Sequence, residues 1–218
     1  MRATGKRELL RGQFVLVRLT EECDAEQIVG WRNAPEAARW LYQWKPLTVQ
    51  DHLAWFRMAR ERGDLLVNFE TLEGEPVGCS SIHSFDHEGT SAECGRICAA
   101  RVGGNPSGMY EGLYLLHRLC FEALVMVRTW SRVATGNERS WHLFQSLGYV
   151  EEGVLRKHWI HPNGYDDVRV AGLFPDEFCE ARKALEAKLY GSGPIPEISA
   201  DVAARIREHF STMGQSFA

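Results

Sequence analysis

The sequence predicts an α/β domain of the α+β kind, in which helices flank a central sheet. Three strand-like runs separated by short turns occupy residues 65–102, and one long amphipathic segment follows at 107–124. Residues 126–173 then follow the order strand, helix, hairpin. With 218 residues, of which 44% are hydrophobic, the chain is long enough for one sizeable core and too short for two independent domains. We therefore expect a single α/β core.

The composition excludes several classes of partner. The formal net charge is −4, and the lysines and arginines form no basic run flanked by aromatics, so we expect no nucleic-acid partner. No apolar stretch reaches the length of a membrane span and the N-terminus lacks an apolar signal core, which predicts a cytoplasmic protein without membrane attachment. The six cysteines contain no CxxC pair, so neither a metal site nor a disulfide framework is expected. Cys94 and Cys98 are expected on one face of a single strand.

The N-terminal part alternates as a strand over residues 14–19 and then favours a helix from about Ala25 to Arg32. Thr48 is a good N-cap for a helix that continues to about Arg62. The intervening segment, residues 31–56, holds four of the seven tryptophans. Its aromatic content is typical of core packing or of a ligand-stacking surface.

The middle of the chain predicts three strands, joined by short turns and therefore antiparallel, at residues 65–72, 77–85 and 92–102. Apolar residues on one helical face then predict a long central helix over 107–124.

The C-terminal part begins with a strand over residues 126–135, after which Asn137 is a good N-cap for a helix of about ten residues. Trp141, Phe144 and Leu147 give that helix an apolar stripe, and Gly148 suits a left-handed C-cap. Further strands are expected at 149–155, 156–160 and 168–173, and the last two form a hairpin around Asn163-Gly164. Two further helices are expected at 176–190 and 199–210, joined by a linker at 191–194. The last helix is expected to pack on the domain or on a second subunit.

The segment from Gly136 to Leu173 resembles the C-terminal half of the GNAT superfamily of acyl-CoA N-acyltransferases. The resemblance lies in the Asn that opens a short helix, the Leu-Gly-aromatic that ends it and the following Glu-Gly-x-x-Arg. It implies a GNAT fold with a mixed, mostly antiparallel sheet, and acetyl-CoA or another short acyl-CoA as co-substrate. We expect an acyltransferase domain over residues 1–178 and a helical extension over 179–218.

The family's pyrophosphate loop reads Gln/Arg-x-x-Gly-x-Gly/Ala, and residues 101–106 match it except that Pro106 stands at the last position. Glycines allow close backbone approach, and a helix N-terminus favours phosphate oxygens. The phosphate contacts could instead begin at Gly108 and Met109, in the first turn of the following helix. Residues that the resemblance implies for the cofactor are Arg101, Val102, Gly103, Gly104, Gly108 and Met109 in this region, and Asn137 and Ser140 for the pantetheine arm.

Amide formation needs an acceptor for the proton of the attacking amine, and Glu93 is the first candidate. A carboxylate inside a strand rich in Ala, Cys and Ile suits a proton acceptor, although a strand-edge carboxylate paired with an arginine is an equal alternative. His83 is the second candidate, with a solvated loop histidine as its alternative. The tyrosine that usually protonates the thiolate in this family is replaced by Phe144, so a bound water is the expected proton source.

Within the superfamily the chain resembles amino-sugar N-acetyltransferases of the pseudaminic-acid pathway type, over about residues 14–178. The matching runs include Trp31-Arg32-Asn33 with Tyr42, the helix containing His52, and Ala92-Glu93-Cys94-Gly95. The resemblance implies a nucleotide-linked amino sugar as acceptor. Aromatic rings could stack its base, and Arg32 or Arg39 could contact its diphosphate. The substrate-binding candidates are Trp31, Arg32, Asn33, Tyr42 and His52.

Two other functions stay open. A protein or peptide N-terminal acetyltransferase of the ribosomal-protein type shares the late Gly-x-x-Arg and should have an open, acidic groove. A catalytically silent GNAT module that binds coenzyme A or a partner is compatible with Phe144 and Pro106. A homodimer is compatible with either enzyme.

Overall fold

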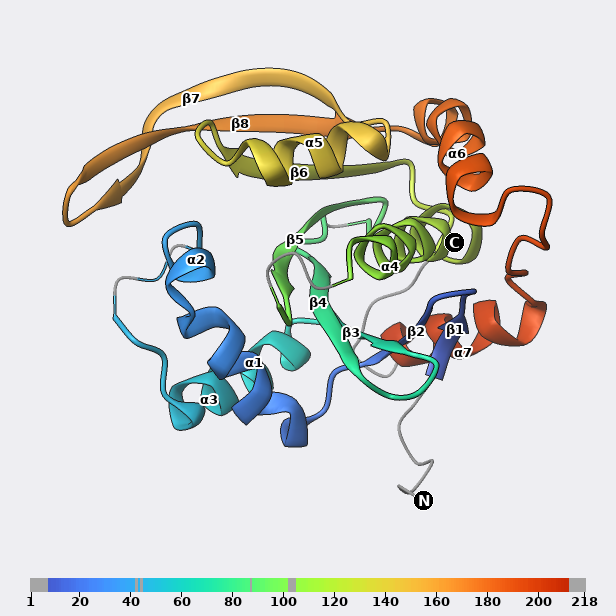
Figure 1. The fold of residues 1–218 in the computed structure, drawn as a ribbon, viewed down its shortest axis with the longest axis horizontal. Helices are drawn as coiled ribbons and strands as arrows, with labels where there is room; N and C mark the ends of the chain where they lie inside the picture. Colours follow the sequence, from blue (N-terminus) through green and yellow to red (C-terminus); the bar gives the residue numbers. More distant parts are fainter. Residues whose placement is uncertain (1–7, 42, 44, 87, 102–104, 212–218) are drawn as a thin grey trace.

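The computed structural model describes residues 8–41, 43, 45–86, 88–101 and 105–211, and these form one eight-stranded sheet flanked by helices (Figure 1). The strand order is β1-β2-β3-β4-β5-β6-β8-β7, and neighbours are antiparallel except for the parallel pair β5 and β6. The predicted mixed, mostly antiparallel sheet is confirmed. The strands are β1 (Glu8–Arg11), β2 (Val15–Leu19), β3 (Leu65–Thr71), β4 (Pro76–His83), β5 (Ser91–Ala99), β6 (Arg128–Ala134), β7 (Val150–His161) and β8 (Gly164–Leu173).

The helices begin and end largely where local sequence chemistry places them. Thr48 caps α3 by accepting a hydrogen bond from the backbone N–H of Asp51 at 3.1 Å. Asn137 caps α5 in the same way, and Gly148 follows that helix with φ of +101°. Both predicted N-caps and the predicted left-handed glycine are confirmed. The helices are α1 (Ala25–Asn33), α2 (Pro35–Ala38), α3 (Val49–Glu61), α4 (Pro106–Arg118), α5 (Glu138–Ser146), α6 (Pro175–Tyr190) and α7 (Ala200–Ser211).

Several elements differ from the expected ones. The sequence did not predict β1 or α2, because a four-residue element is too short to show a period. The two strands expected at 149–155 and 156–160 are one strand, β7, with an irregular register between Leu155 and Trp159. The central helix is α-helical only to Arg118 and then continues as a π-helical turn over Leu119–Ala123.

The expectation that Cys94 and Cys98 share a face of one strand is wrong. Cys94 lies in the main core, whereas Cys98 packs against Ile28 of α1. The cause is a bulge in β5, where the register with β4 shifts and Arg96 adopts φ of +55°. One extra residue reverses the alternation of side chains along a strand.

The main hydrophobic core lies between α4 and the sheet, and both C-terminal helices contribute to it. Phe178 and Leu185 of α6 are buried there, as are Ile206 and Phe210 of α7. The boundary expected between residues 178 and 179 therefore falls inside α6, and α7 packs on this chain's own core. Among the described residues, no helix is long and apolar enough to cross a membrane.

Candidate active site

The sheet opens between its two parallel strands. β5 pairs with β6 only from Ser91–Arg128 to Glu93–Trp130, although β5 continues to Ala99 and β6 to Ala134. Within the described part of the chain, the edge of β5 that faces β6 has no ladder partner beyond Glu93. A strand edge without a ladder partner can pair with an extended ligand that carries amides.

Glu93 and His83 meet at this opening. They are register partners on β5 and β4, and His83 Nε2 lies 3.5 Å from Glu93 Oε2. Both side chains are about 7% exposed. Arg132 of β6 donates from Nε and Nη2 to the two oxygens of Glu93, at 3.1 and 3.0 Å. The structure thus brings both predicted catalytic candidates together and adds a guanidinium that orients the carboxylate. The same ion pair is what the alternative for Glu93, a strand carboxylate paired with an arginine, predicts.

His83 is a neutral imidazole over the physiological pH range. Burial, reinforced by the charges of Arg96 and Arg132, lowers its pKa from 6.5 to about 3. Its Nδ1 lies 3.1 Å from the hydroxyl of Ser81. A group with so low a pKa is a poor acceptor for an ammonium proton, which argues against His83 as the base.

A pocket lies beside this pair, between α1, α3 and the strands β4 and β5. Arg32 and His52, both predicted as substrate-binding residues, line it together with Trp55, Ser81 and Arg96. It holds about 310 Å³ of unoccupied space, including the part open to solvent. The structure therefore places two predicted substrate-binding residues in a pocket that adjoins His83 and Glu93.

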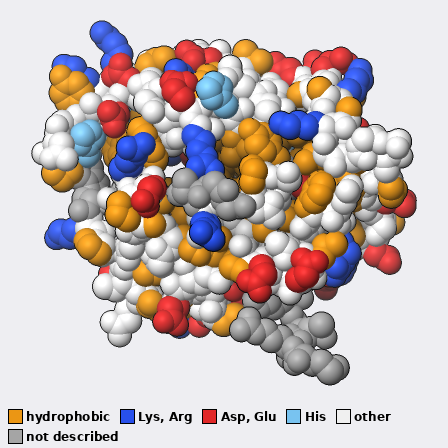
Figure 2. All heavy atoms as spheres, in the orientation of Figure 1, with side chains coloured by type: hydrophobic (Ala, Val, Ile, Leu, Met, Phe, Trp, Pro, Cys, Tyr) orange, Lys and Arg blue, Asp and Glu red, His pale blue; other side chains and the backbone are white. Residues whose placement is uncertain are grey.

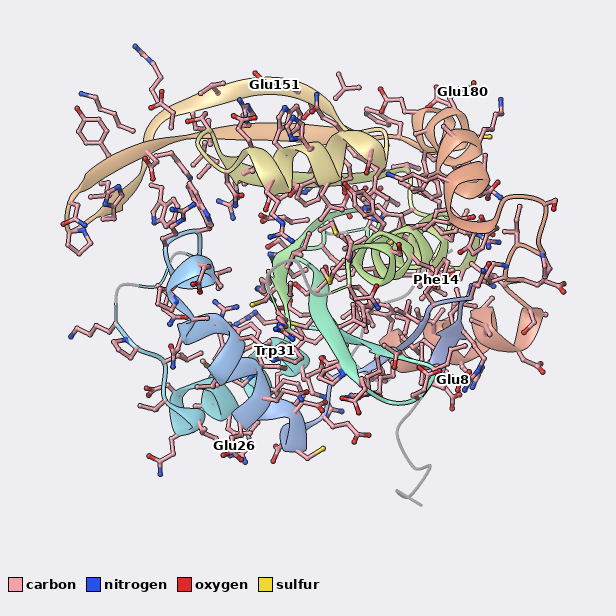
Figure 3. All side chains as sticks on the ribbon, in the orientation of Figure 1. Glu8, Phe14, Glu26, Trp31, Glu151 and Glu180 are labelled. Atoms are coloured by element: carbon pink, nitrogen blue, oxygen red, sulfur yellow. The ribbon has the colours of Figure 1, made fainter. Side chains whose placement is uncertain are left out.

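The other residues predicted for the substrate lie differently. Trp31 belongs to α1 (Figure 3), and its side chain packs against a small cluster of Ile28, Cys79 and Cys98. Asn33 uses its side-chain amide to hold Gln43 and Leu47, with contacts of 2.8–2.9 Å. These contacts give both residues a structural role beside the pocket. Tyr42 lies outside the described residues.

The expected cofactor loop is partly outside the described residues, since Val102, Gly103 and Gly104 fall there. Arg101 is exposed just before them. Asn105 caps α4: its side chain accepts from Gly108 N at 2.8 Å and its carbonyl from Met109 N at 3.1 Å. The amides of Gly108 and Met109 are therefore already engaged within the first turn of α4.

Asn137 stands at the start of α5, immediately after β6, with its side-chain oxygen 3.3 Å from Ser140 N.

Trp40 from the N-terminal segment packs in a cluster with Trp159 of β7, so that segment reaches the strands on the far side of the opening. Phe144 is buried and contacts the ring of Tyr149 edge-on, with centroids 4.9 Å apart.

Arg96 and Arg132 were missed from the sequence. The available signal for Arg132 was that Arg128, Trp130 and Arg132 are two residues apart along the predicted strand and so share one face; Arg132 on that face pairs with Glu93. No signal existed for Arg96, because the bulge that turns it toward the pocket depends on how β5 pairs with β4.

In the described ranges, no group of three or more histidine, cysteine or acidic side chains is arranged to hold a metal ion. On the face shown in Figure 2, acidic and basic side chains are interspersed.

The family model and the similar solved structures all indicate one family, the acetyltransferases. Residues 13–150 match the model of the acetyltransferase (GNAT) domain, whereas no curated protein matches the sequence. A presumed acetyltransferase from T. thermophilus is 27% identical with a TM-score of 0.70, covering 87% of this chain and 100% of that one. A GCN5-related N-acetyltransferase from Brucella melitensis shares the fold at 17% identity and a TM-score of 0.71, covering 96% of each chain.

A spermidine N-acetyltransferase from Vibrio cholerae, solved in complex with CoA and spermine, also shares the fold. It is 17% identical with a TM-score of 0.68, covering 76% of this chain and 98% of that one. The matched domain spans more than half of the sequence and includes the strands that carry Glu93, His83 and Arg132. The chain therefore belongs to the GNAT acetyltransferase family and is an acyl-CoA-dependent N-acetyltransferase.

Proposed function

We propose that this enzyme transfers an acetyl or other short acyl group from coenzyme A to the primary amine of a small acceptor, by direct attack in a ternary complex. The amine nitrogen bonds to the thioester carbonyl carbon, and the carbon–sulfur bond breaks as the tetrahedral intermediate collapses. Glu93 accepts the proton that the nitrogen loses, and a bound water protonates the thiolate. The observation that carries this assignment is the buried Glu93 carboxylate, held by Arg132 at the edge of the opening between β5 and β6.

The opening suits the acyl donor. The pantetheine arm is extended and carries two amides, which can pair with the free edge of β5. Asn137 and Ser140 flank the far side of the opening, and the N-terminal end of α4 follows the segment that begins at Arg101. Backbone N–H groups of β5 beyond Glu93 supply donors for the oxyanion of the intermediate.

A nucleotide-linked amino sugar is the acceptor that we propose. The pocket beside Glu93 is lined by Arg32, Arg96 and the aromatic ring of Trp55, which is the chemistry that a diphosphate and a sugar face require. A peptide N-terminus, whose enzymes need an acidic groove, fits this basic lining less well.

The test is to incubate the protein with acetyl-CoA and separate panels of nucleotide-linked amino sugars, free amino sugars, basic peptides and polyamines, and to follow free thiol and acetylated product. We expect release with the nucleotide-linked amino sugars. Release only with basic peptides would assign the protein to the N-terminal acetyltransferases. Tight acetyl-CoA binding without acetylation of any amine would identify a silent module and overturn the proposal.

A further inference from the structure

The pocket between α1, α3 and the strands β4 and β5 contains an unmatched positive charge. Arg32 reaches it from α1, and no described carboxylate forms an ion pair with this side chain. Its Nε is buried without a hydrogen-bond partner. A buried N–H that lacks an acceptor destabilises the unliganded site, so this site favours any ligand that supplies one.

The acidic side chains near this pocket are committed to other arginines. Asp64, which is 4% exposed, lies 2.7 Å from Arg96. Asp24 receives two hydrogen bonds of 2.7 Å from Arg18, one to each carboxylate oxygen. The negative charge close to the pocket is therefore already balanced, and the positive charge of Arg32 stands in excess.

The rest of the lining suits an oxyanion. His52 is 4% exposed, and its ring nitrogens contact none of the described residues by hydrogen bonding. Its ring lies 5.3 Å from that of Trp55, over which Arg96 is placed at 5.0 Å. Burial, with the charge of Arg32, lowers the pKa of His52 to about 4, so the neutral ring presents one N–H donor at neutral pH. The hydroxyl of Ser81 adds a further polar group to the lining.

The pocket adjoins the catalytic pair. Ser81 lines it and contacts His83 Nδ1 at 3.1 Å, and His83 in turn lies 3.5 Å from Glu93. A group bound beside Arg32 and a reacting amine beside Glu93 therefore fit within one small molecule.

We infer that Arg32 and His52 form a subsite for an oxyanion, a carboxylate or phosphate group, of the acceptor amine. The inference rests on the proposed acetyltransferase function. It makes the enzyme selective for amines that also carry a negative charge, and against polyamines, whose extra ammonium groups would meet an unpaired guanidinium. In this respect the pocket has the opposite preference to that of a polyamine site.

Acceptor kinetics test the inference with Arg32→Gln, and Arg60→Gln on the exposed face of α3 is the matched control. The wild type should turn over a phosphorylated or nucleotide-linked amino sugar, or an amino acid, with a lower KM than the uncharged amino sugar or spermidine. Loss of one charge-assisted contact should raise the KM for the charged acceptor about 10–100-fold, with kcat and the KM for acetyl-CoA little changed. Comparing the phosphorylated acceptor with the carboxylated one distinguishes the two oxyanions. Equal KM values for charged and uncharged acceptors, or an R32Q effect no larger than that of R60Q, would overturn the inference.

A binding measurement separates this inference from the proposed function. Inorganic phosphate and acetate are titrated calorimetrically into the wild type, Arg32→Gln and Arg60→Gln without any amine. Binding of at least one anion that R32Q alone loses supports the subsite even if no acceptor is acetylated. Identical titrations of wild type and R32Q would contradict the subsite while leaving amine acetylation intact.

Discussion

Three side chains of different charge meet where β5 and β6 separate, and their physical chemistry assigns them different tasks. Glu93 is held at both oxygens by Arg132, so its orientation is fixed before a substrate arrives. His83 lies against the same carboxylate and is uncharged at neutral pH. In the proposed mechanism the carboxylate is therefore the base, and the neutral imidazole beside it helps to position it.

Replacing His83 tests this division. Because the pKa of His83 is about 3, His83→Gln should leave the pH at which kcat/KM falls unchanged between pH 5.5 and 8, while kcat drops by about tenfold or less. Steady-state rates across that range provide the measurement. If the ionisation that limits the wild type on its acidic side disappeared in the variant, His83 would be the base.

At the scale of the element, two helix caps with the same local chemistry lie in different surroundings. Asn137 caps α5 beside the opening of the sheet, and Thr48 caps α3 away from it. Glu111 of α4 also connects two elements. Its carboxylate is fully buried and accepts hydrogen bonds from the backbone amides of Gln13, Phe14 and Val15 at 2.6–2.9 Å. It fixes the turn between β1 and β2 to the central helix.

The caps give a matched pair of variants. Asn137→Ala and Thr48→Ala should each cost about 1 kcal/mol of stability, because each removes one N-cap hydrogen bond. Only Asn137→Ala should also weaken acetyl-CoA binding, by about tenfold. Urea denaturation and calorimetry measure the two effects. Equal acetyl-CoA affinity in both variants would restrict Asn137 to capping.

The Glu111 contact predicts a larger loss of stability. Glu111→Gln replaces one acceptor oxygen with an NH₂ group that faces backbone donors, so we expect about 2–4 kcal/mol of destabilisation in urea. Gly12 belongs to the same turn, where a Cβ would stand 2.6 Å from the carboxylate oxygens. Glu180→Gln, which removes an exposed partner of Lys183, is the control and should cost under about 0.5 kcal/mol. If the two variants lost a similar amount of stability, the contact between Glu111 and the turn between β1 and β2 would not contribute as predicted.

Across the whole molecule, the features that could be predicted from the sequence are those that depend on residues close together in the chain. The caps at Thr48 and Asn137 and the turn at Gly148 depend on neighbouring residues and were predictable. The bulge at Arg96 was not, because it arises from pairing between β4 and β5. Nor was the charge balance of the pocket lined by Arg32 and Arg96, since the Arg96–Asp64 ion pair joins residues far apart in the chain.

Three buried histidines make the stability of the whole fold depend on pH. Burial lowers the pKa of His83 to about 3, and those of His52 and His117 to about 4. The unfolded chain, with ordinary values near 6.5, binds more protons than the folded one below that pH. Folding stability is therefore full above pH 6.5 and falls as the pH drops toward 4, by up to about 1.4 kcal/mol per histidine per pH unit.

Urea denaturation at pH 7.5, 6, 5 and 4 measures this dependence. His117→Phe should reduce the number of protons taken up on unfolding by about one. His117 is chosen because it lies in the core, with Nε2 hydrogen-bonded to the Tyr149 hydroxyl at 2.8 Å, away from the pocket. If the unfolding free energy of this variant depended on pH as strongly as that of the wild type, groups other than His117 would cause the loss of stability at low pH.

The most direct test of the whole account is the pH–rate profile of Glu93→Gln beside that of the wild type, with the best acceptor amine. If Glu93 accepts the amine proton, the variant should lose about 100-fold or more in kcat/KM at pH 7 and recover part of that loss toward pH 9.5, where the free amine is already deprotonated. A variant with the wild-type rate and profile would show that the carboxylate between Arg132 and His83 is structural, and would contradict the mechanism.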